Sequence, residues 1–220
     1  MMSRMPLTKK LQMRNHCAKI AKSSYRLTGL AVFILVAMLL PGCERKVKVA
    51  GIKTDTMNYY AARQSGRNWC WAACIQMVLA ARGIDLSQEQ IAQRTFGNTM
   101  DRPAGIDAVC ANLDGWAVKR DGKPSQLTAL MGLGPPRLDL MIENFQNQVP
   151  IVVYLEPPDR GVGHAVVVTA VEYRDDGPTP QILNITVRDP DPFFAGTMGK
   201  RMLMPEEYAN IGAFVIVKEH

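Results

Sequence analysis

The hydrophobic pattern of this 220-residue chain changes its period at Pro150, and this change constrains the fold more than any other feature. Before Pro150, apolar residues recur at three- and four-residue spacing, which is typical of helices. This spacing predicts helices over residues 69–82, 87–96, 105–113, 125–131 and 137–148. After Pro150, β-branched runs bounded by turn residues predict strands over residues 151–156, 163–174, 182–190 and 213–219. Helices followed by strands predict an α+β fold, with a helical N-terminal half and an antiparallel β-sheet meander in the C-terminal half.

The N-terminus has the pattern of an export signal. Residues 1–42 carry seven basic residues and no acidic one, and they include the apolar run Leu30–Leu40. The sequence LPGC that ends at Cys43 resembles the bacterial lipobox, so Cys43 is expected to be lipidated; a signal-anchor helix with an incidental cysteine is the alternative. The predicted domains are a lipoprotein signal peptide over 1–42, a tether or lead-in strand over 43–62, and one folded domain over 63–220.

The positive net charge belongs to this signal. The whole chain has 26 basic and 20 acidic residues, and without the seven of the signal it has 19 basic and 20 acidic residues. A mature chain near neutrality gives no support for nucleic-acid binding. We expect a protein of the bacterial cell envelope, lipid-anchored on the periplasmic side. Glu44 after Cys43, by analogy with enterobacterial sorting, favours the outer membrane.

The stretch RNWCWAACIQMVLAARG, residues 67–83, predicts a buried helix that carries two cysteines. Asn68 suits its N-cap and Gly83 its C′ position. Cys70 lies in the first turn, where the helix dipole favours a thiolate, and Cys74 lies one turn deeper, where that effect is spent. The sequence therefore favours Cys70 as a nucleophile and Cys74 as a structural residue. It leaves open whether Cys74 forms a disulfide with Cys110.

A thiol nucleophile needs a base, and elimination points to one histidine. His16 lies in the signal and His220 is the last residue, which leaves His164 at the start of the longest predicted strand. The next strand ends at Asp189, which would lie near His164 if the two strands pair antiparallel. Asp191 is the second choice. Taken alone, a histidine at a strand edge is structural and an Asp-Pro-Asp-Pro stretch is a turn.

Gln64 lies six residues before Cys70, in the loop that leads into the helix. Its side-chain amide could stabilise an oxyanion together with the backbone N–H of Cys70. A surface glutamine is the alternative.

These motifs together resemble the papain-like cysteine peptidase superfamily. The matching residues, in the order of that family, are Gln64, Cys70-Trp71-Ala72, Gly163-His164-Ala165-Val166 and Asp189. WCWAAC resembles the stand-alone bacterial peptidases related to the double-glycine-leader (bacteriocin-processing) enzymes and to some plant-pathogen effector proteases. The third motif ends in Asp-Pro, as in the double-glycine branch, where papain itself has Asn. The resemblance covers residues 63 to about 217.

The resemblance implies a papain-like fold, in which a central helix carries the nucleophile and a β half carries the base. It implies peptide-bond hydrolysis by a triad of Cys70, His164 and Asp189, with Gln64 as oxyanion donor. It implies no metal and no cofactor. The expected partners are a peptide or protein substrate and a membrane, reached through the lipid anchor; no nucleic acid is expected, and the chain is expected to be a monomer.

Two other function classes stay open. An acyltransferase or amidase could use the same triad on peptidoglycan or another envelope amide. A non-catalytic envelope binding module would leave the triad unused.

Overall fold

The computed structural model describes residues 46–120, 122–156 and 163–220. The predicted signal peptide over 1–42 and the predicted lipidation of Cys43 lie outside the described residues. The helices are α2 (Thr54–Tyr59), α3 (Cys70–Ala80), α4 (Gln88–Phe96), α5 (Ile106–Leu113), α6 (Leu138–Gln146), α7 (Pro205–Ala209) and the 3-10 helix η1 (Pro192–Thr197). The strands are β1 (Lys48–Gly51), β2 (Ala117–Arg120), β3 (Lys123–Leu133), β4 (Ile151–Leu155), β5 (His164–Arg174), β6 (Gln181–Arg188), β7 (Lys200–Met202) and β8 (Ile211–Glu219).

All strands belong to one antiparallel sheet with the order β2-β3-β8-β4-β5-β6-β7, and β1 pairs with β5. The predicted α+β class is confirmed, as are the four strands after Pro150. The predicted simple meander is wrong in part: β4 to β7 form one, but β8 inserts between β3 and β4. The order of helices first and strands second is also incomplete, because β1, β2 and β3 come before Pro150.

The predicted helix over residues 125–131 is wrong, because these residues lie in β3. Their leucine, alanine and methionine content favours a helix. In the fold they pair with β8 from Leu127 opposite Glu219 to Leu133 opposite Ala213. Leu127 and Ala129 are buried and Thr128 between them is not, which is the two-residue alternation of a strand. Tertiary pairing thus outweighs the local preference.

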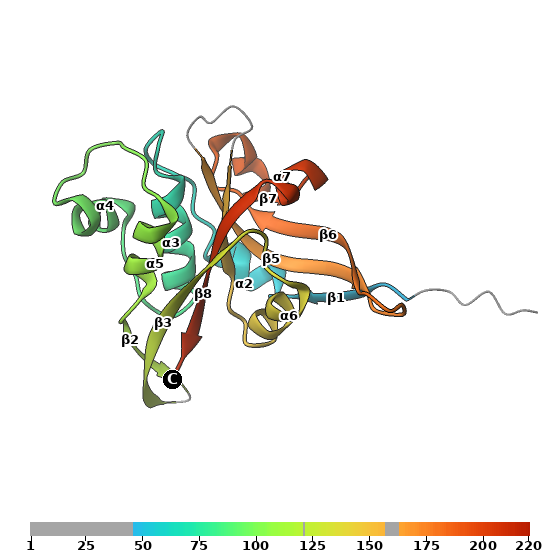
Figure 1. The fold of residues 1–220 in the computed structure, drawn as a ribbon. Helices are drawn as coiled ribbons and strands as arrows, with labels where there is room; N and C mark the ends of the chain where they lie inside the picture. The colour runs from blue at the N-terminus through green and yellow to red at the C-terminus, as the bar shows by residue number, and fades with distance from the viewer. Residues whose placement is uncertain (1–45, 121, 157–162) are drawn as a thin grey trace, which may run out of the picture. The chain divides into compact units, whose positions relative to one another are not determined.

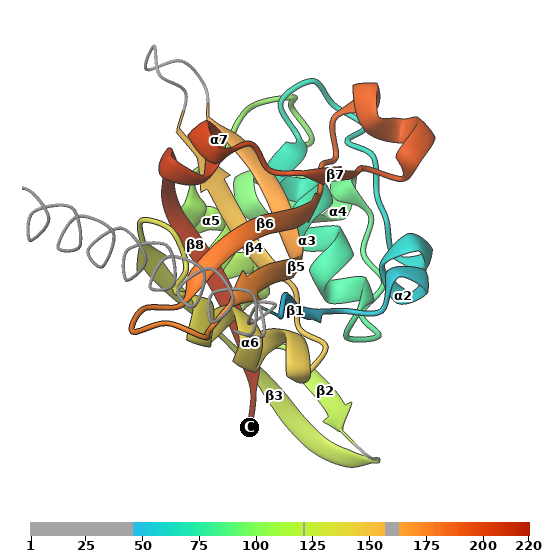
Figure 2. The same cartoon turned by 90° about the vertical axis from the view of Figure 1, so that its right-hand side faces the viewer.

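Helix α3 is the centre of the helical layer. It packs against β5 of the sheet and contacts α4 and α5 on its other sides, as Figure 1 shows. Nine of its eleven residues are buried, which agrees with the predicted all-round apolar helix. Helix α6 lies on the opposite side of the sheet, against β1 and β5 (Figure 2).

The ends of the helices follow their sequence signals in two cases out of three. Gly83 has a φ of +77° and closes α3 by donating its N–H to Ala80 O (3.0 Å), as expected for a C′ glycine. Ser87 and Gln90 form the capping box of α4. Asn68 is not the N-cap of α3: the cap is Trp69, and no side chain in the described structure caps this helix.

The lead-in before residue 63 contributes β1, which pairs with β5 from Lys48 opposite Tyr173 to Gly51 opposite Ala170. Helix α2 follows it and is an element that the sequence does not predict. The cysteines at 70, 74 and 110 are all free, so the Cys74–Cys110 disulfide is not formed. Over the described ranges, every helix falls short of the length and apolarity that crossing a bilayer requires.

Candidate active site

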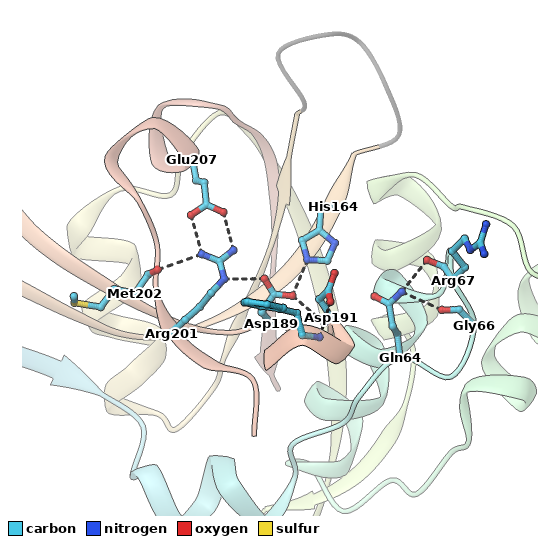
Figure 3. A network of polar contacts seen from close by, with 10 residues as sticks. Gln64, Gly66, Arg67, His164, Asp189, Asp191, Arg201, Met202 and Glu207 are labelled. Atoms are coloured by element: carbon cyan, nitrogen blue, oxygen red, sulfur yellow. Dashed lines mark hydrogen bonds and ion pairs between the residues drawn. The ribbon is translucent and has the colours of Figure 1, made fainter. Parts of the chain in front are cut away.

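His164 and Asp189 lie at neighbouring strand ends, as the antiparallel pairing of β5 and β6 requires. His164 begins β5, Arg188 ends β6, and the register sets Arg188 opposite Val167. Asp189, the next residue, reaches back to the start of β5. The two side chains meet with His164 Nε2 at 2.7 Å from Asp189 Oδ1 (Figure 3).

The carboxylate of Asp189 is buried, with 2% of its side chain exposed, and it accepts three hydrogen bonds. Oδ1 accepts from His164 Nε2 and from the backbone N–H of Asp191 (2.9 Å), and Oδ2 accepts from Arg201 Nε (2.8 Å). Burial alone would raise the pKa of Asp189, but the hydrogen bonds from His164, Asp191 and Arg201 and the charge of His164 lower it below its usual value. The group is therefore an ionised acceptor next to the imidazole.

Asp191, the second choice from the sequence, has a different role in the structure. Its Oδ1 accepts the backbone N–H of Phe193 at 2.8 Å and so caps η1. Its contact with Asp189 is through its own N–H. The register of β5 and β6 therefore brings Asp189, and not Asp191, to His164.

The charge state of His164 follows from its partners. Burial lowers the pKa of His164, but hydrogen bonds to Asp189 and to Cys70, and the charges of both, outweigh burial and raise that pKa from 6.5 to about 10. At neutral pH the imidazole is thus held as imidazolium. Because Nε2 faces Asp189, Nδ1 is the ring nitrogen that is left for the Cys70 thiol.

Cys70 is the first residue of α3, where backbone N–H groups have no carbonyl one turn earlier to bind. Cys74 lies one turn deeper and is fully buried. Burial, followed by the charges of Cys70 and Asp189, raises the pKa of Cys74 well above its usual value. The two cysteines of α3 therefore differ: Cys74 is fully buried, and Cys70 is the one that contributes to the raised pKa of His164.

Gln64 lies in the loop before α3, and its side-chain amide is turned toward that loop. Nε2 donates to Gly66 O at 3.0 Å and to Arg67 O at 2.8 Å (Figure 3). Its backbone N–H donates to Pro190 O at 2.9 Å, which ties the loop to the residue after Asp189. The loop is therefore beside the His164–Asp189 pair, while the amide hydrogens of Gln64 are bound to carbonyls within the loop.

Gln88 is a residue of this region that sequence reasoning missed. It is buried at the start of α4, and its Oε1 accepts from Ser65 N at 2.9 Å and Ser65 Oγ at 3.0 Å. Its Nε2 donates to Arg63 O at 2.8 Å and to Gln76 Oε1 at 3.0 Å. The residues on both sides of Gln64 are thus bound to one side chain. In the sequence, Gln88 is only one of three polar residues after Ser87, and nothing marks it.

Arg201 and Glu207 are the other two residues that the sequence analysis missed. The Arg201 guanidinium donates from Nη1 to Glu207 Oε2 and from Nη2 to Glu207 Oε1, both at 2.7 Å. Its Nε donates to Asp189, so the two residues extend the polar chain from His164 (Figure 3). Both lie beyond the third motif, in a segment whose charged residues look like ordinary surface positions.

Tyr154 lines the site from β4. The ring of Tyr154 occupies the space where a Cβ of Gly163 would lie, so the glycine before His164 lets this ring approach the strand backbone. Burial, and then the charge of Cys70, raise the pKa of Tyr154. The described residues hold no group of three or more His, Cys, Asp or Glu side chains that could bind a metal ion; the absence of a metal or cofactor stays a prediction.

Taken together, the site has a thiol at a helix N-terminus, an imidazole, and a buried carboxylate that is bound to the imidazole. These are the kinds of group that a thiol nucleophile, its base and an orienting carboxylate require. A model of the Peptidase_C39 like family matches residues 54–211, so this chain belongs to that family. The membership confirms the resemblance to papain-like cysteine peptidases of the bacteriocin-processing branch.

Among solved structures, the chain is similar to the peptidase domain of Streptococcus ComA, described as a bi-functional ABC transporter involved in a quorum sensing pathway. The two are 14% identical, and the match covers 72% of this chain and 97% of that chain with a TM-score of 0.45. No curated protein matches this chain.

Proposed function

We propose that this chain hydrolyses peptide bonds, with Cys70 as nucleophile, His164 as acid and base, and Asp189 as the orienting carboxylate. The observation that carries the proposal is the 2.7 Å contact between His164 Nε2 and Asp189 Oδ1. This contact uses Nε2 and leaves Nδ1 for the Cys70 thiol, and Cys70 contributes to the raised pKa of His164. Family membership supports a cysteine peptidase independently of this geometry.

The chemistry proceeds in two balanced steps. The Cys70 thiolate attacks the carbonyl carbon, and the C–N bond breaks as His164 gives its proton to the leaving amine, which leaves a thioester. A water molecule then gives a proton to His164 and attacks the thioester, and the C–S bond breaks to release the acid. The raised pKa of His164, about 10, favours the imidazolium that the first step needs.

Stabilisation of the oxyanion is assigned to the backbone N–H of Cys70 and to the side-chain amide of Gln64. The first-turn position of Cys70 supports the first assignment, because its N–H is one of the unpaired donors of a helix start. For the second, one amide hydrogen of Gln64 has to turn from a carbonyl of Gly66 or Arg67 to the substrate oxygen. The other amide hydrogen of Gln64 then keeps its bond to the second of these two carbonyls.

The test of this function is active-site labelling followed by substrate comparison. A thiol-reactive peptide probe is expected to label the wild-type protein and the Cys74→Ala and Cys110→Ala variants, but not Cys70→Ala. Labelling that is lost in Cys74→Ala and kept in Cys70→Ala would overturn the assigned nucleophile. The same proteins are then given a peptide library and, separately, muropeptides. Cleavage of peptides supports the peptidase; turnover of muropeptides alone would replace it with a peptidoglycan amidase.

We also propose that the mature protein is tethered to the envelope through lipid on Cys43, on the sequence evidence of the basic, apolar and LPGC segments. Fatty-acid labelling of the full chain is expected in wild type and is expected to be lost in Cys43→Ser. Labelling that persists in Cys43→Ser would exclude this anchor, and it would leave the peptidase proposal untouched.

A further inference from the structure

Two charged residues behind Asp189 form a continuous polar chain with it. Arg201 Nε donates to Asp189 Oδ2 at 2.8 Å, and its two terminal nitrogens donate to the two oxygens of Glu207 at 2.7 Å. The side chains of Asp189, Arg201 and Glu207 are 2%, 14% and 30% exposed. The chain therefore runs from the buried carboxylate of Asp189 to the more exposed Glu207, and Figure 3 shows the contacts that join its members.

We propose that Arg201 and Glu207 are positioning residues of the peptidase site, in which Arg201 orients the Asp189 carboxylate and Glu207 neutralises Arg201 so that His164 keeps its positive charge. This inference rests on the proposed function, since it concerns the same His164. Neither residue touches the substrate or the thiol; both act through Asp189.

Counting hydrogen-bond donors supports the role of Arg201. The Asp189 side chain receives N–H groups from His164 and Asp191 on Oδ1 and from Arg201 on Oδ2, so both oxygens must be acceptors. An asparagine has only one acceptor oxygen, and its NH2 group would face a donor. Arg201 is thus a physical reason for this chain to carry Asp189 where papain has Asn.

Counting charges supports the role of Glu207. Asp189, Arg201 and Glu207 together carry one negative charge, and adding an imidazolium at His164 makes the group neutral. Without Glu207 the same group with an imidazolium would carry one positive charge in a partly buried place, which is unfavourable. Burial raises the pKa of Glu207, but the hydrogen bonds from Arg201 and Met204 outweigh burial and lower this pKa below its usual value. The carboxylate is therefore ionised.

The local structure holds this pair in one geometry. Arg201 lies in β7 opposite Val187 of β6, and its guanidinium lies 5.1 Å from the ring centroid of Phe194. Glu207 lies in the first turn of α7, where its Oε2 also accepts the backbone N–H of Met204 at 2.8 Å. A guanidinium can bind one carboxylate with two nitrogens and a second with its Nε, whereas the ammonium of a lysine cannot reproduce this fork.

Other groups near His164 are the same in all variants that the test requires. Cys70 and Cys74 lie on α3, the ring of Tyr154 on β4 lies against Gly163, and Asp189 and Asp191 follow β6. A change in the pH profile that follows a change at Glu207 therefore reports on Glu207 and Arg201.

The experiment compares Glu207→Gln with Glu206→Gln, which removes the same charge at the exposed neighbouring position of α7. kcat/KM for a peptide substrate is measured from pH 5 to pH 11. The alkaline limb reports loss of the His164 proton, and Glu207→Gln is expected to move it to lower pH by about one unit. Glu206→Gln is expected to leave it in place. A limb that is equal in the two variants would overturn the proposed role of Glu207.

Arg201→Lys tests the orienting role. It is expected to lower kcat about 10- to 100-fold with a smaller change in KM, because the displaced Asp189 no longer orients the imidazole. Circular dichroism and the melting temperature establish that the variant is folded. A folded Arg201→Lys with the wild-type kcat would overturn the role of Arg201.

A second readout separates this inference from the proposed function. The rate at which iodoacetamide alkylates Cys70 depends on the protonation state of the imidazole beside it and needs no substrate. If the wild-type protein cleaves no peptide, the peptidase proposal fails, while the alkylation profiles of Glu207→Gln and Glu206→Gln still decide the inference. The profile of Glu207→Gln is expected to differ from that of wild type, and equal profiles would overturn it.

Discussion

The Cys70 side of the site is held by apolar packing and by hydrogen bonds to the backbone, whereas the His164 side is held by ionised side chains that bind one another. On the first side, α3 is buried on nearly every face. The backbone of the loop before it is bound by the amide of Gln88 and the carboxylate of Asp101. On the second side, the imidazole is bound to a carboxylate, which is bound to a guanidinium and a second carboxylate.

The difference matches what each side has to do. A nucleophile at a helix start has to be held still, and close packing together with hydrogen bonds to the backbone provides this rigidity. A base has to keep a defined protonation state, and only nearby charges and hydrogen bonds shift a pKa in the required direction. Changes on the helical side should therefore alter mainly stability, and changes on the sheet side should alter mainly rate and pH dependence.

The largest effect is expected for Asp189→Asn, on the charged side. The amide cannot accept from both His164 and Arg201, so the imidazole loses its orientation and kcat is expected to fall about 10²–10⁴-fold. Steady-state kinetics on folded protein measure this. Asp191→Asn is the matched control, since asparagine also caps η1, and its rate should stay near wild type. Equal rates in the two variants would contradict the distinction between these residues.

A stability effect of about 3–5 kcal/mol is expected for Trp71→Ala, on the packed side. The Trp71 ring is fully buried, meets Phe96 edge-on with centroids 5.6 Å apart, and donates from Nε1 to Arg102 O at 3.2 Å. Urea unfolding measures the free energy of unfolding. The pH dependence of the remaining activity should be unchanged. A shifted alkaline limb would contradict the claim that only the sheet side controls pH dependence.

A smaller loss, about 1–3 kcal/mol, is expected for Gln88→Leu, which leaves the backbone groups of Arg63 and Ser65 without their partner. Because Gln64 lies between these residues, kcat should fall as well, though less than in Asp189→Asn. Gln93→Leu, at an exposed position of the same helix, is the control and should change neither quantity. A loss of stability with an unchanged kcat would show that the loop holds Gln64 without Gln88.

The smallest effect is expected for Ser87→Ala, which removes the capping box of α4. The free energy of unfolding should fall by about 1 kcal/mol, with kcat unchanged. Thermal unfolding checks the first value and initial rates the second. Ser87→Asp restores a capping oxygen and should recover the stability; if it does not, the cap is not the source of the loss.

Much of the fold could be predicted because its signals are local. The helix that carries Cys70, the capping box at Ser87 and the strand that begins at His164 each depend on residues adjacent in sequence. The strand β3 could not be predicted, because its composition favours a helix and only its pairing with β8, some 90 residues later, makes it a strand. The position of β8 inside the sheet is likewise a tertiary property.

The candidate site divides in the same way. Elimination among three histidines and the position of Cys70 in a helix start need only the sequence. The choice of Asp189 over Asp191 depends on the register of β5 and β6, which the sequence leaves to inference. Arg201 and Glu207 carry no motif, and they join Asp189 only because β7 folds back along β6 and α7 follows.

The sequence by itself determined which residues could react and on which kinds of element they lie, because helix starts, strand runs and residue chemistry are encoded locally. Only the tertiary structure decided the partners of each group: the three donors around Asp189, the loop carbonyls that hold Gln64, and the free state of Cys74 and Cys110. The physical reason is that hydrogen bonds and pKa shifts act over a few ångströms in space. Strand pairing and register set those distances, and they join residues far apart in the chain.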